Sequence, residues 1–284
     1  MRLINFNRLK AWLHTCLTDH VHQEPEAASS IANLRVIDCH HSGRVVVPAP
    51  TECEYVALSY VWGVQGPGNF EDADGFPPTV MDAVIATKKL GYRYLWVDRY
   101  CIDQSDENDQ HNQIKQMDLI YSHAKVTIIA AAGKDPSYGL PGVSRNSFEK
   151  VYTEPLNSNW ALKTELPPLF SCFITSNWFL RAWTLQEGIL SKRKLCFTDY
   201  GVLFLCNSNT TGNTCLECES FKDHAKKYKQ LSIPMESAMN GIIPNNILEA
   251  QTSEEKLSII KVFLDAYSQR ELTYESDSLN ALLG

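Results

Sequence analysis

The chain has 284 residues, 44% of them hydrophobic and 21% charged, as in ordinary soluble globular proteins. Its formal charge of −7 argues against broad binding to nucleic acids or anionic membranes, and the short basic stretch 222–229 does not reverse that balance. No apolar run approaches the roughly 18 residues of a membrane span. Residues 1–6 lack the apolar core of a signal peptide. We therefore expect a cytoplasmic protein that binds no nucleic acid and spans no membrane.

The nine cysteines are odd in number and irregularly spaced, which fits reduced thiols better than a secreted disulfide framework. Cys215 and Cys218 have the spacing of half a zinc site, and Cys206 lies nearby in the sequence. No second pair of that kind follows them, so the sequence predicts neither a metal site nor a bound cofactor. The run 39–41 (CHH) is equally incomplete, and we interpret it as the polar end of a strand.

Residues 1–50 are expected to form a helix and a β-hairpin that pack on the core. Apolar side chains recur with helical spacing over 6–22, which indicates an amphipathic helix, and a polar linker follows at 24–30. The runs 34–38 and 44–48 are rich in β-branched residues and flank a short polar turn, which predicts a hairpin.

A repeating strand–helix pattern occupies residues 51–206. Three nearly continuous apolar runs, 55–62, 94–98 and 125–133, are typical of strands that are covered on both faces. Helical spacing of apolar residues lies between them, with Gly91 as the expected end of the first helix. This β-α-β-α-β order predicts an α/β fold whose parallel sheet has right-handed crossovers.

The second half of the chain has a less regular pattern. Residues 134–175 are expected to be a long insertion, of the kind that closes over a site or contains extra elements. A helix over 177–190 and a strand over 194–198 follow it. Residues 207–284 are expected to be a partly helical extension, because a capping box at 252–255 opens a helix there.

Polar residues follow the predicted strands at their carboxyl ends, where parallel α/β sheets bind ligands. They are Ser59, Tyr60, Trp62 and Gly63 after the first strand, Asp98, Arg99, Asp103 and Gln104 after the second, and Arg181, Trp183 and Glu187 on the helix after the insertion. Trp183 precedes Glu187 by one helical turn, so its indole is expected to shield the carboxylate from water and raise its reactivity. We expect these residues to form one pocket, in which Glu187 would be the first candidate for a catalytic residue if the protein is an enzyme.

Each of these residues also has a structural interpretation. Asp98 and Asp103 can cap a helix or a turn, Ser59 can be a small strand residue, and Arg181 can form an ion pair with Glu187 or with an aspartate. Glu187 can be an exposed helix residue, although its apolar neighbours argue against full exposure. Trp96, inside a predicted buried strand, is expected to be a core residue.

Several catalytic motifs are absent, namely the G-x-S-x-G elbow, the G-x-x-x-x-G-K-[ST] phosphate loop and H-E-x-x-H. Cys101 with His111 or His123 offers a thiol–imidazole pair. Because Cys101 follows a buried strand directly, a buried inert thiol is the favoured interpretation.

Five motifs, in this order, resemble the heterokaryon-incompatibility (HET) domain of filamentous fungi. They are 55–63 (YVALSYVWG), 95–104 (LWVDRYCIDQ), 113–133 (QIKQMDLIYSHAKVTIIAAAG), 139–143 (GLPGV) and 181–187 (RAWTLQE). The resemblance spans residues 55–190, and the tail 272–282 resembles a segment found downstream of the domain in larger members. It implies a role in non-self recognition and regulated cell death after cell fusion, with self-association and a regulatory protein partner.

A more distant resemblance is to Toll/interleukin-1 receptor (TIR) domains. The order of elements is similar, and residues 183–187 (WTLQE) resemble their W-C-x-x-E segment, with Thr184 in place of the cysteine and a longer insertion before it. This resemblance implies a flavodoxin-like/TIR-like parallel sheet flanked by helices. It also implies that NAD+ or a related nucleotide is the substrate, hydrolysed at the nicotinamide–ribose bond with Glu187 as the catalytic carboxylate.

In that reaction Trp62 or Trp183 would stack on a base or on nicotinamide, and Arg99 or Arg181 would pair with the pyrophosphate. The alternative that the sequence leaves open is a non-catalytic, self-associating signalling module that triggers cell death through partners.

Overall fold

The computed structural model describes residues 3–20, 22, 31–41, 45–63, 75–144, 153–155, 160–163, 167–206, 215–220, 252–272, 278 and 281. The strands are β1 (Arg35–Asp38), β2 (Val46–Pro48), β3 (Tyr55–Ser59), β4 (Tyr94–Val97), β5 (Val126–Ala130), β6 (Thr153–Pro155), β7 (Ala161–Lys163), β8 (Arg193–Thr198), β9 (Gly201–Cys206) and β10 (Cys215–Ser220). The helices are α1 (Phe6–Asp19), α2 (Pro78–Leu90), α3 (Asp98–Cys101), α4 (Glu107–Ile114), α5 (Met117–His123), α6 (Leu169–Ile174), α7 (Asn177–Leu180), α8 (Trp183–Leu190) and α10 (Ser253–Ser268).

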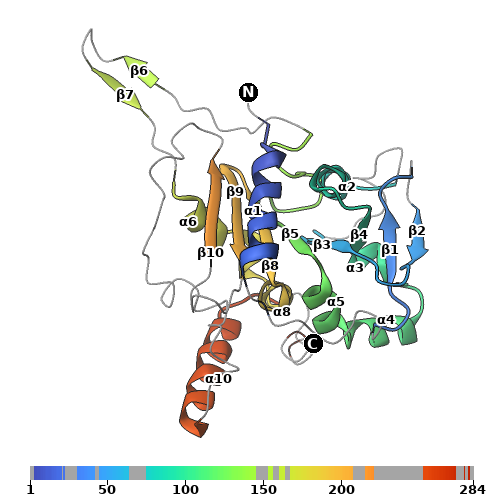
Figure 1. The fold of residues 1–284 in the computed structure, drawn as a ribbon. Coiled ribbons are helices and arrows are strands. Elements are labelled where there is room, and N and C mark those ends of the chain that lie inside the picture. The colour runs from blue at the N-terminus through green and yellow to red at the C-terminus, as the bar shows by residue number, and fades with distance from the viewer. Residues whose placement is uncertain are drawn as a thin grey trace.

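A mixed sheet of eight strands forms the centre of the fold, in the order β10-β9-β8-β5-β3-β4-β1-β2 (Figure 1). Its four middle strands, β8, β5, β3 and β4, are parallel. Within this parallel centre the chain forms β3 first, then β4 on one side of β3, and then β5 on its other side. The topological switch point therefore lies between β3 and β5. The predicted α/β fold with a parallel centre is therefore confirmed.

Antiparallel strands extend both sides of this parallel centre. The predicted hairpin is formed by β1 and β2, and it joins the sheet through the antiparallel pairing of β1 with β4. On the other side β9 pairs with β8, and β10 pairs with β9. The sequence analysis did not predict β9 or β10.

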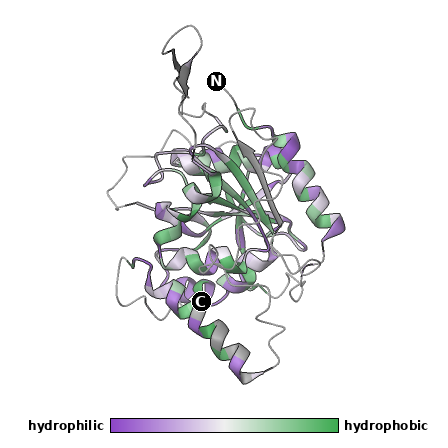
Figure 2. Ribbon diagram, turned by 90° about the vertical axis from the view of Figure 1, so that its left-hand side faces the viewer, coloured by the Kyte–Doolittle hydropathy of each residue, from purple (hydrophilic) through white to green (hydrophobic). Residues whose placement is uncertain are grey.

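The strands are buried because helices cover both faces of the sheet. Every residue of β3, β5, β8 and β9 is buried, and Figure 2 shows these strands as a hydrophobic layer between more polar helices. α1 lies beside α2 over one part of the sheet, whereas α6 packs on β8 and β9 and α5 packs on α8. Gly91, with φ of 100°, ends α2 as predicted, because its N–H bonds the carbonyls of Thr87 and Lys88.

The helix predicted over 177–190 is wrong in one respect, since it is broken into α7 and α8. The hydroxyl of Thr184 donates to the carbonyls of Trp178 and Arg181. The backbone of Glu271 pairs with both sides of the break, through Ala182 N–H (3.0 Å) and the Leu180 carbonyl (2.7 Å). Backbone groups that a continuous helix would satisfy are thus satisfied by a side chain and by the segment after α10.

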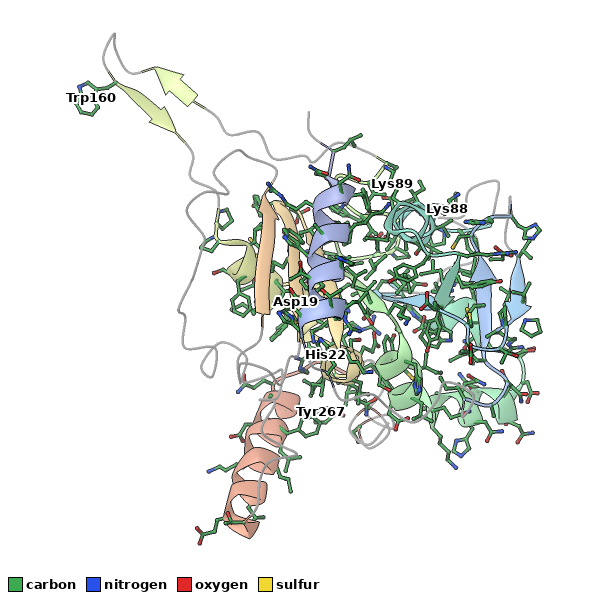
Figure 3. All side chains as sticks on the ribbon, in the orientation of Figure 1. Asp19, His22, Lys88, Lys89, Trp160 and Tyr267 are labelled. Carbon is green, nitrogen blue, oxygen red and sulfur yellow. The ribbon has the colours of Figure 1, made fainter. Side chains whose placement is uncertain are left out.

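Other boundaries also differ from the prediction. β3 ends at Ser59, before Trp62, and the short helix α3 follows β4 directly, with α4 after it. The expected insertion contains α6 and a small hairpin, β6 and β7, beside which Trp160 is 72% exposed and projects from the body (Figure 3). The stretches 24–30 and 222–229 lie outside the described residues. Among the described residues, no helix is long and apolar enough to cross a membrane.

Candidate active site

Glu187 is buried against the carboxyl end of β3. Its side chain accepts a hydrogen bond from the hydroxyl of Ser59, the last residue of that strand. The residue is only 6% exposed, so it is not an exposed helix residue. The structure therefore brings together two residues that the sequence analysis placed in one pocket.

A tryptophan that the sequence analysis did not select completes this contact. The indole N–H of Trp178, on α7, donates to the same Ser59 hydroxyl at 2.5 Å. In an unbroken helix Trp178 and Glu187 would be about two and a half turns apart and would face opposite ways. The break between α7 and α8 changes that phase, and for this reason periodicity did not identify Trp178. Trp183, which was expected to shield the carboxylate, is half-buried on α8.

Tyr121 is the second residue that the prediction missed. It lies on α5, which packs on α8, and its ring meets Trp96 edge-on with 5.4 Å between centroids. Burial, followed by the charges of Glu187 and Asp98, raises the pKa of the Tyr121 hydroxyl well above its ordinary value. The spacing of residues 117–121 predicted a helix, but nothing in it indicated which strand end that helix would face.

Asp98 brings a second carboxylate to this edge of the sheet. It follows β4 directly, and its two oxygens accept from the indole N–H of Trp62 at 3.0 and 3.1 Å. The guanidinium of Arg99 lies over the Trp62 ring, 5.7 Å from its centroid. Residues after β3 and after β4 thus form a second set of contacts beside the first.

The two carboxylates interact electrostatically. Burial, reinforced by the negative charge of Glu187, raises the pKa of Asp98 to about 7. Burial also raises the pKa of Glu187, although the Ser59 hydrogen bond and the charge of Arg181 oppose that shift. Two acids with raised pKa values at one sheet edge are suited to proton transfer near neutral pH.

The remaining predicted residues lie at different distances from this centre. Tyr60 is buried, and the charge of Asp98 adds to the burial that raises the pKa of its hydroxyl. Gln104 is exposed and donates to the Asp98 carbonyl at 3.3 Å. Asp103 is exposed and accepts from the backbone and hydroxyl of Ser105, so it has the turn-capping role that the sequence left open.

Gly63 has φ of 76°, and a Cβ there would lie 3.1 Å from Pro136 and 3.2 Å from Asp135. It permits the close approach of two loops beside the site. Of the structural alternatives, Trp96 is a fully buried core residue, as predicted. Cys101 is also buried, and burial raises its pKa to about 12, which agrees with an inert thiol.

Known proteins are similar to this chain over the segment that carries this site. The family described as heterokaryon incompatibility protein (HET) matches residues 55–187. A curated relative, heterokaryon incompatibility protein 6, OR allele, of Neurospora crassa, is 25% identical over 207 residues, which are 56% of this chain and 30% of the relative. No solved structure matches the chain. Ser59, Asp98 and Glu187 all lie inside the segment, residues 55–187, that matches the heterokaryon-incompatibility (HET) family.

Proposed function

We propose that this protein is an effector of fungal non-self recognition and regulated cell death that hydrolyses NAD+ at the nicotinamide–ribose bond. The name of the Neurospora relative, heterokaryon incompatibility protein 6, supports the first part. The second part rests mainly on one observation: a buried carboxylate, Glu187, lies at the carboxyl edge of a parallel sheet together with a second carboxylate whose pKa is about 7. The resemblance of residues 183–187 to the catalytic segment of TIR domains points the same way.

The two carboxylates suit the reaction. Breaking the bond between ribose C1′ and the nicotinamide nitrogen sends the electron pair to the pyridinium ring, so nicotinamide leaves as a neutral molecule. The ribose passes through an oxocarbenium-like state, as in glycoside hydrolysis, and an ionised Glu187 would stabilise its positive charge. Water then attacks C1′, and Asp98 would accept its proton. The products are nicotinamide, ADP-ribose and a proton.

Other residues of the site suit the rest of the substrate. Trp62 and the half-buried Trp183 offer faces for stacking on an aromatic ring. Arg181 is electrostatically coupled to both carboxylates, and Arg99 lies beside Trp62, so each can pair with a pyrophosphate. Ser59 now donates to Glu187, and this bond would have to open for the carboxylate to reach a ribose hydroxyl.

One observation favours a second function, that of a non-catalytic signalling module. Glu187 is almost fully buried, and Ser59 joins it to Trp178, so these contacts also connect β3, α7 and α8. A hydrogen-bonded network of this kind can serve the fold alone. On that view the domain triggers cell death by recruiting partners.

The release of nicotinamide from NAD+ by the purified protein distinguishes the two functions. The assay covers a range of protein concentrations, because self-association is expected. We expect Glu187→Gln to reduce turnover by about 100-fold or more, as loss of one electrostatic contact in a transition state does. Glu107→Gln, an exposed glutamate on α4, is the matched control and should retain activity.

The same variants, expressed in a fungal host, test the link to cell death. Loss of killing by a folded Glu187→Gln variant would support the enzyme. Absence of turnover at every concentration, together with killing that Glu187→Gln leaves intact, would instead establish the signalling module.

A further inference from the structure

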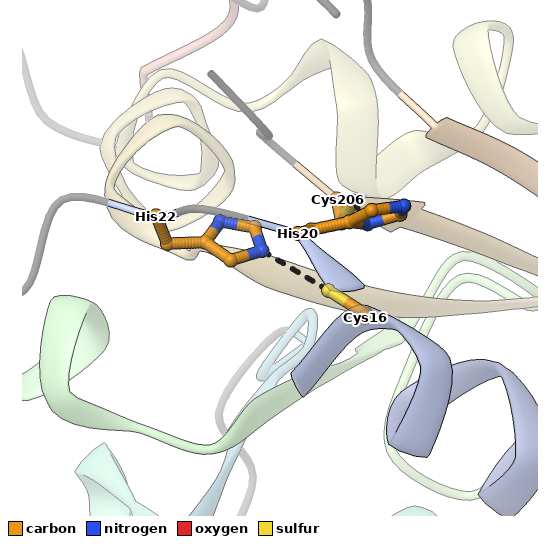
Figure 4. Close-up of side chains that lie close together, drawn as sticks. All are labelled: Cys16, His20, His22 and Cys206. Carbon is orange, nitrogen blue, oxygen red and sulfur yellow. Dashed lines mark hydrogen bonds between the residues drawn. The ribbon is translucent and has the colours of Figure 1, made fainter. Parts of the chain in front are cut away.

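A group of four metal-ligating side chains lies away from the acidic site, where α1 meets the end of β9. Cys16 is in the last turns of α1, His20 and His22 follow that helix, and Cys206 is the last residue of β9 (Figure 4). One ligand atom from each of the four lies within 4.8 Å of every other. Two parts of the chain, residues 16–22 and the end of β9, thus direct sulfur and nitrogen atoms at one point.

The distances are close to those of a metal site. His22 Nε2 is 3.1 Å from Cys16 Sγ, and His20 Nδ1 is 3.2 Å from Cys206 Sγ. In a tetrahedral zinc site, bonds of about 2.3 Å to sulfur and 2.0–2.1 Å to nitrogen separate these two atoms by about 3.6 Å. For these two pairs, a shift of a few tenths of an ångström would give the spacing of a zinc site.

The side chains of this group are largely buried. Cys16 and Cys206 are 0% exposed, and His22 is 8% exposed. The Nε–H of Arg193 also donates to Cys16 Sγ at 3.3 Å, which is the kind of outer contact that orients and stabilises a thiolate ligand.

We propose that Cys16, His20, His22 and Cys206 bind one Zn²⁺ ion as a structural site. Two thiolates and two imidazoles form the donor set that zinc takes in closed tetrahedral sites. Because the protein supplies all four ligands, no position remains for a substrate or a reactive water, so the site would not be catalytic.

The ion would connect parts of the chain on either side of the HET-matched segment. α1 precedes residues 55–187 and Cys206 follows them, with His20 and Cys206 separated by 186 in residue number. Zinc would hold α1 against β9, so the N-terminal helix would be fixed to the sheet rather than merely packed on it.

The test begins with the full chain, purified without a metal-affinity tag or added metal. We expect elemental analysis to find about one zinc per chain. Replacement by cobalt should produce the d–d absorption of tetrahedral Co²⁺ and a sulfur-to-cobalt charge-transfer band. Cys206→Ser and His22→Ala should each lose most of the metal. Cys53→Ser and His14→Ala, a thiol and an imidazole outside the group, should keep it.

The wild-type protein decides the question even if the ligand variants do not fold. Folded wild-type protein without zinc, and without a thiolate–cobalt band after Co²⁺ is added, would overturn the proposal. A mass lower by two hydrogens, located to a Cys16–Cys206 disulfide in freshly purified protein, would overturn it as well. Zinc that stays bound in both Cys206→Ser and His22→Ala would show that the ion belongs elsewhere.

Discussion

Two buried polar clusters in this protein have opposite electrostatics. In the acid cluster, Asp98 and Glu187, burial raises both pKa values and so favours the neutral forms, and the charge of Glu187 raises the pKa of Asp98 further. In the Cys–His cluster, Cys16, His20, His22 and Cys206, hydrogen bonds and a nearby cation lower the pKa of Cys16 and favour its charged form. The acid cluster thus has groups suited to exchanging protons, whereas the Cys–His cluster has a charged ligand suited to holding a cation.

Metal removal should have the largest effect on stability and should affect only the Cys–His cluster. An ion that binds the folded state alone raises the melting temperature. We expect a strong chelator to lower the melting temperature of the wild-type protein by about 5 °C or more. Glu187→Gln should respond to the chelator like wild type, whereas Cys206→Ser should not respond. Differential scanning fluorimetry with and without chelator measures this, and equal melting temperatures would contradict it.

Asp98→Asn should stabilise the protein at neutral and alkaline pH but not at acidic pH. The unfolded carboxyl ionises near its ordinary pKa of 3.8, whereas the folded one ionises near 7, so wild-type stability falls as the pH rises through that window. The asparagine variant has no such loss. At about pH 8 it should exceed wild type by a few kcal/mol, and below about pH 4 this advantage should disappear.

Urea unfolding across that pH range measures the difference for Asp98→Asn. A stability difference that does not change with pH would show that Asp98 has the same pKa in the folded and the unfolded protein. The proposed electrostatic contrast between the acid cluster and the Cys–His cluster would then fail.

Trp178→Phe tests whether the hydrogen bond to Ser59 stabilises the acid cluster. Phenylalanine keeps the stack on Phe173, where the centroids are 5.5 Å apart, but lacks the N–H donor. We expect the free energy of unfolding to fall by about 1–2 kcal/mol. Trp12 also stacks on a phenylalanine, Phe204, at 6.3 Å, and Trp12→Phe is the matched control. Equal losses in the two variants would mean that the hydrogen bond contributes nothing.

Gly188→Ala should have the smallest effect. A Cβ at this position would lie 3.1 Å from Cη2 of Trp178, which is tighter than an ordinary contact. The crowding and the better helix propensity of alanine oppose each other, so the net change should stay within about 1 kcal/mol. In the Trp178→Phe background the crowding is relieved and the same substitution should be stabilising. A double-mutant cycle measures this coupling, and additivity would contradict it.

The local pattern of the sequence predicts most of the sheet and part of the acid cluster. Continuous apolar runs identified β3, β4 and β5, because strands covered on both faces carry few polar residues. Parallel strands place their carboxyl ends at one edge, so Ser59 and Asp98 were expected beside the helix that carries Glu187. The contact between Ser59 and Glu187 follows that expectation.

Other features could not be read from periodicity. Trp178 reaches Ser59 only because α7 and α8 are two helices, and the break depends on Glu271, which lies far along the chain. Asp103 could equally have faced the site or capped a turn, since the residue type suits both, and the structure places it at Ser105.

What the sequence by itself determined is the α/β order, the HET motif set and the position of Glu187 at a strand edge, since each depends on neighbouring residues or on one general rule of parallel sheets. Only the tertiary structure decided the raised pKa of Asp98 and the meeting of Cys16, His20 and His22 with Cys206. Those features arise where α1 packs on β9 and α8 on α5. An amphipathic pattern shows that a helix buries one face, but it does not specify which partner that face will meet.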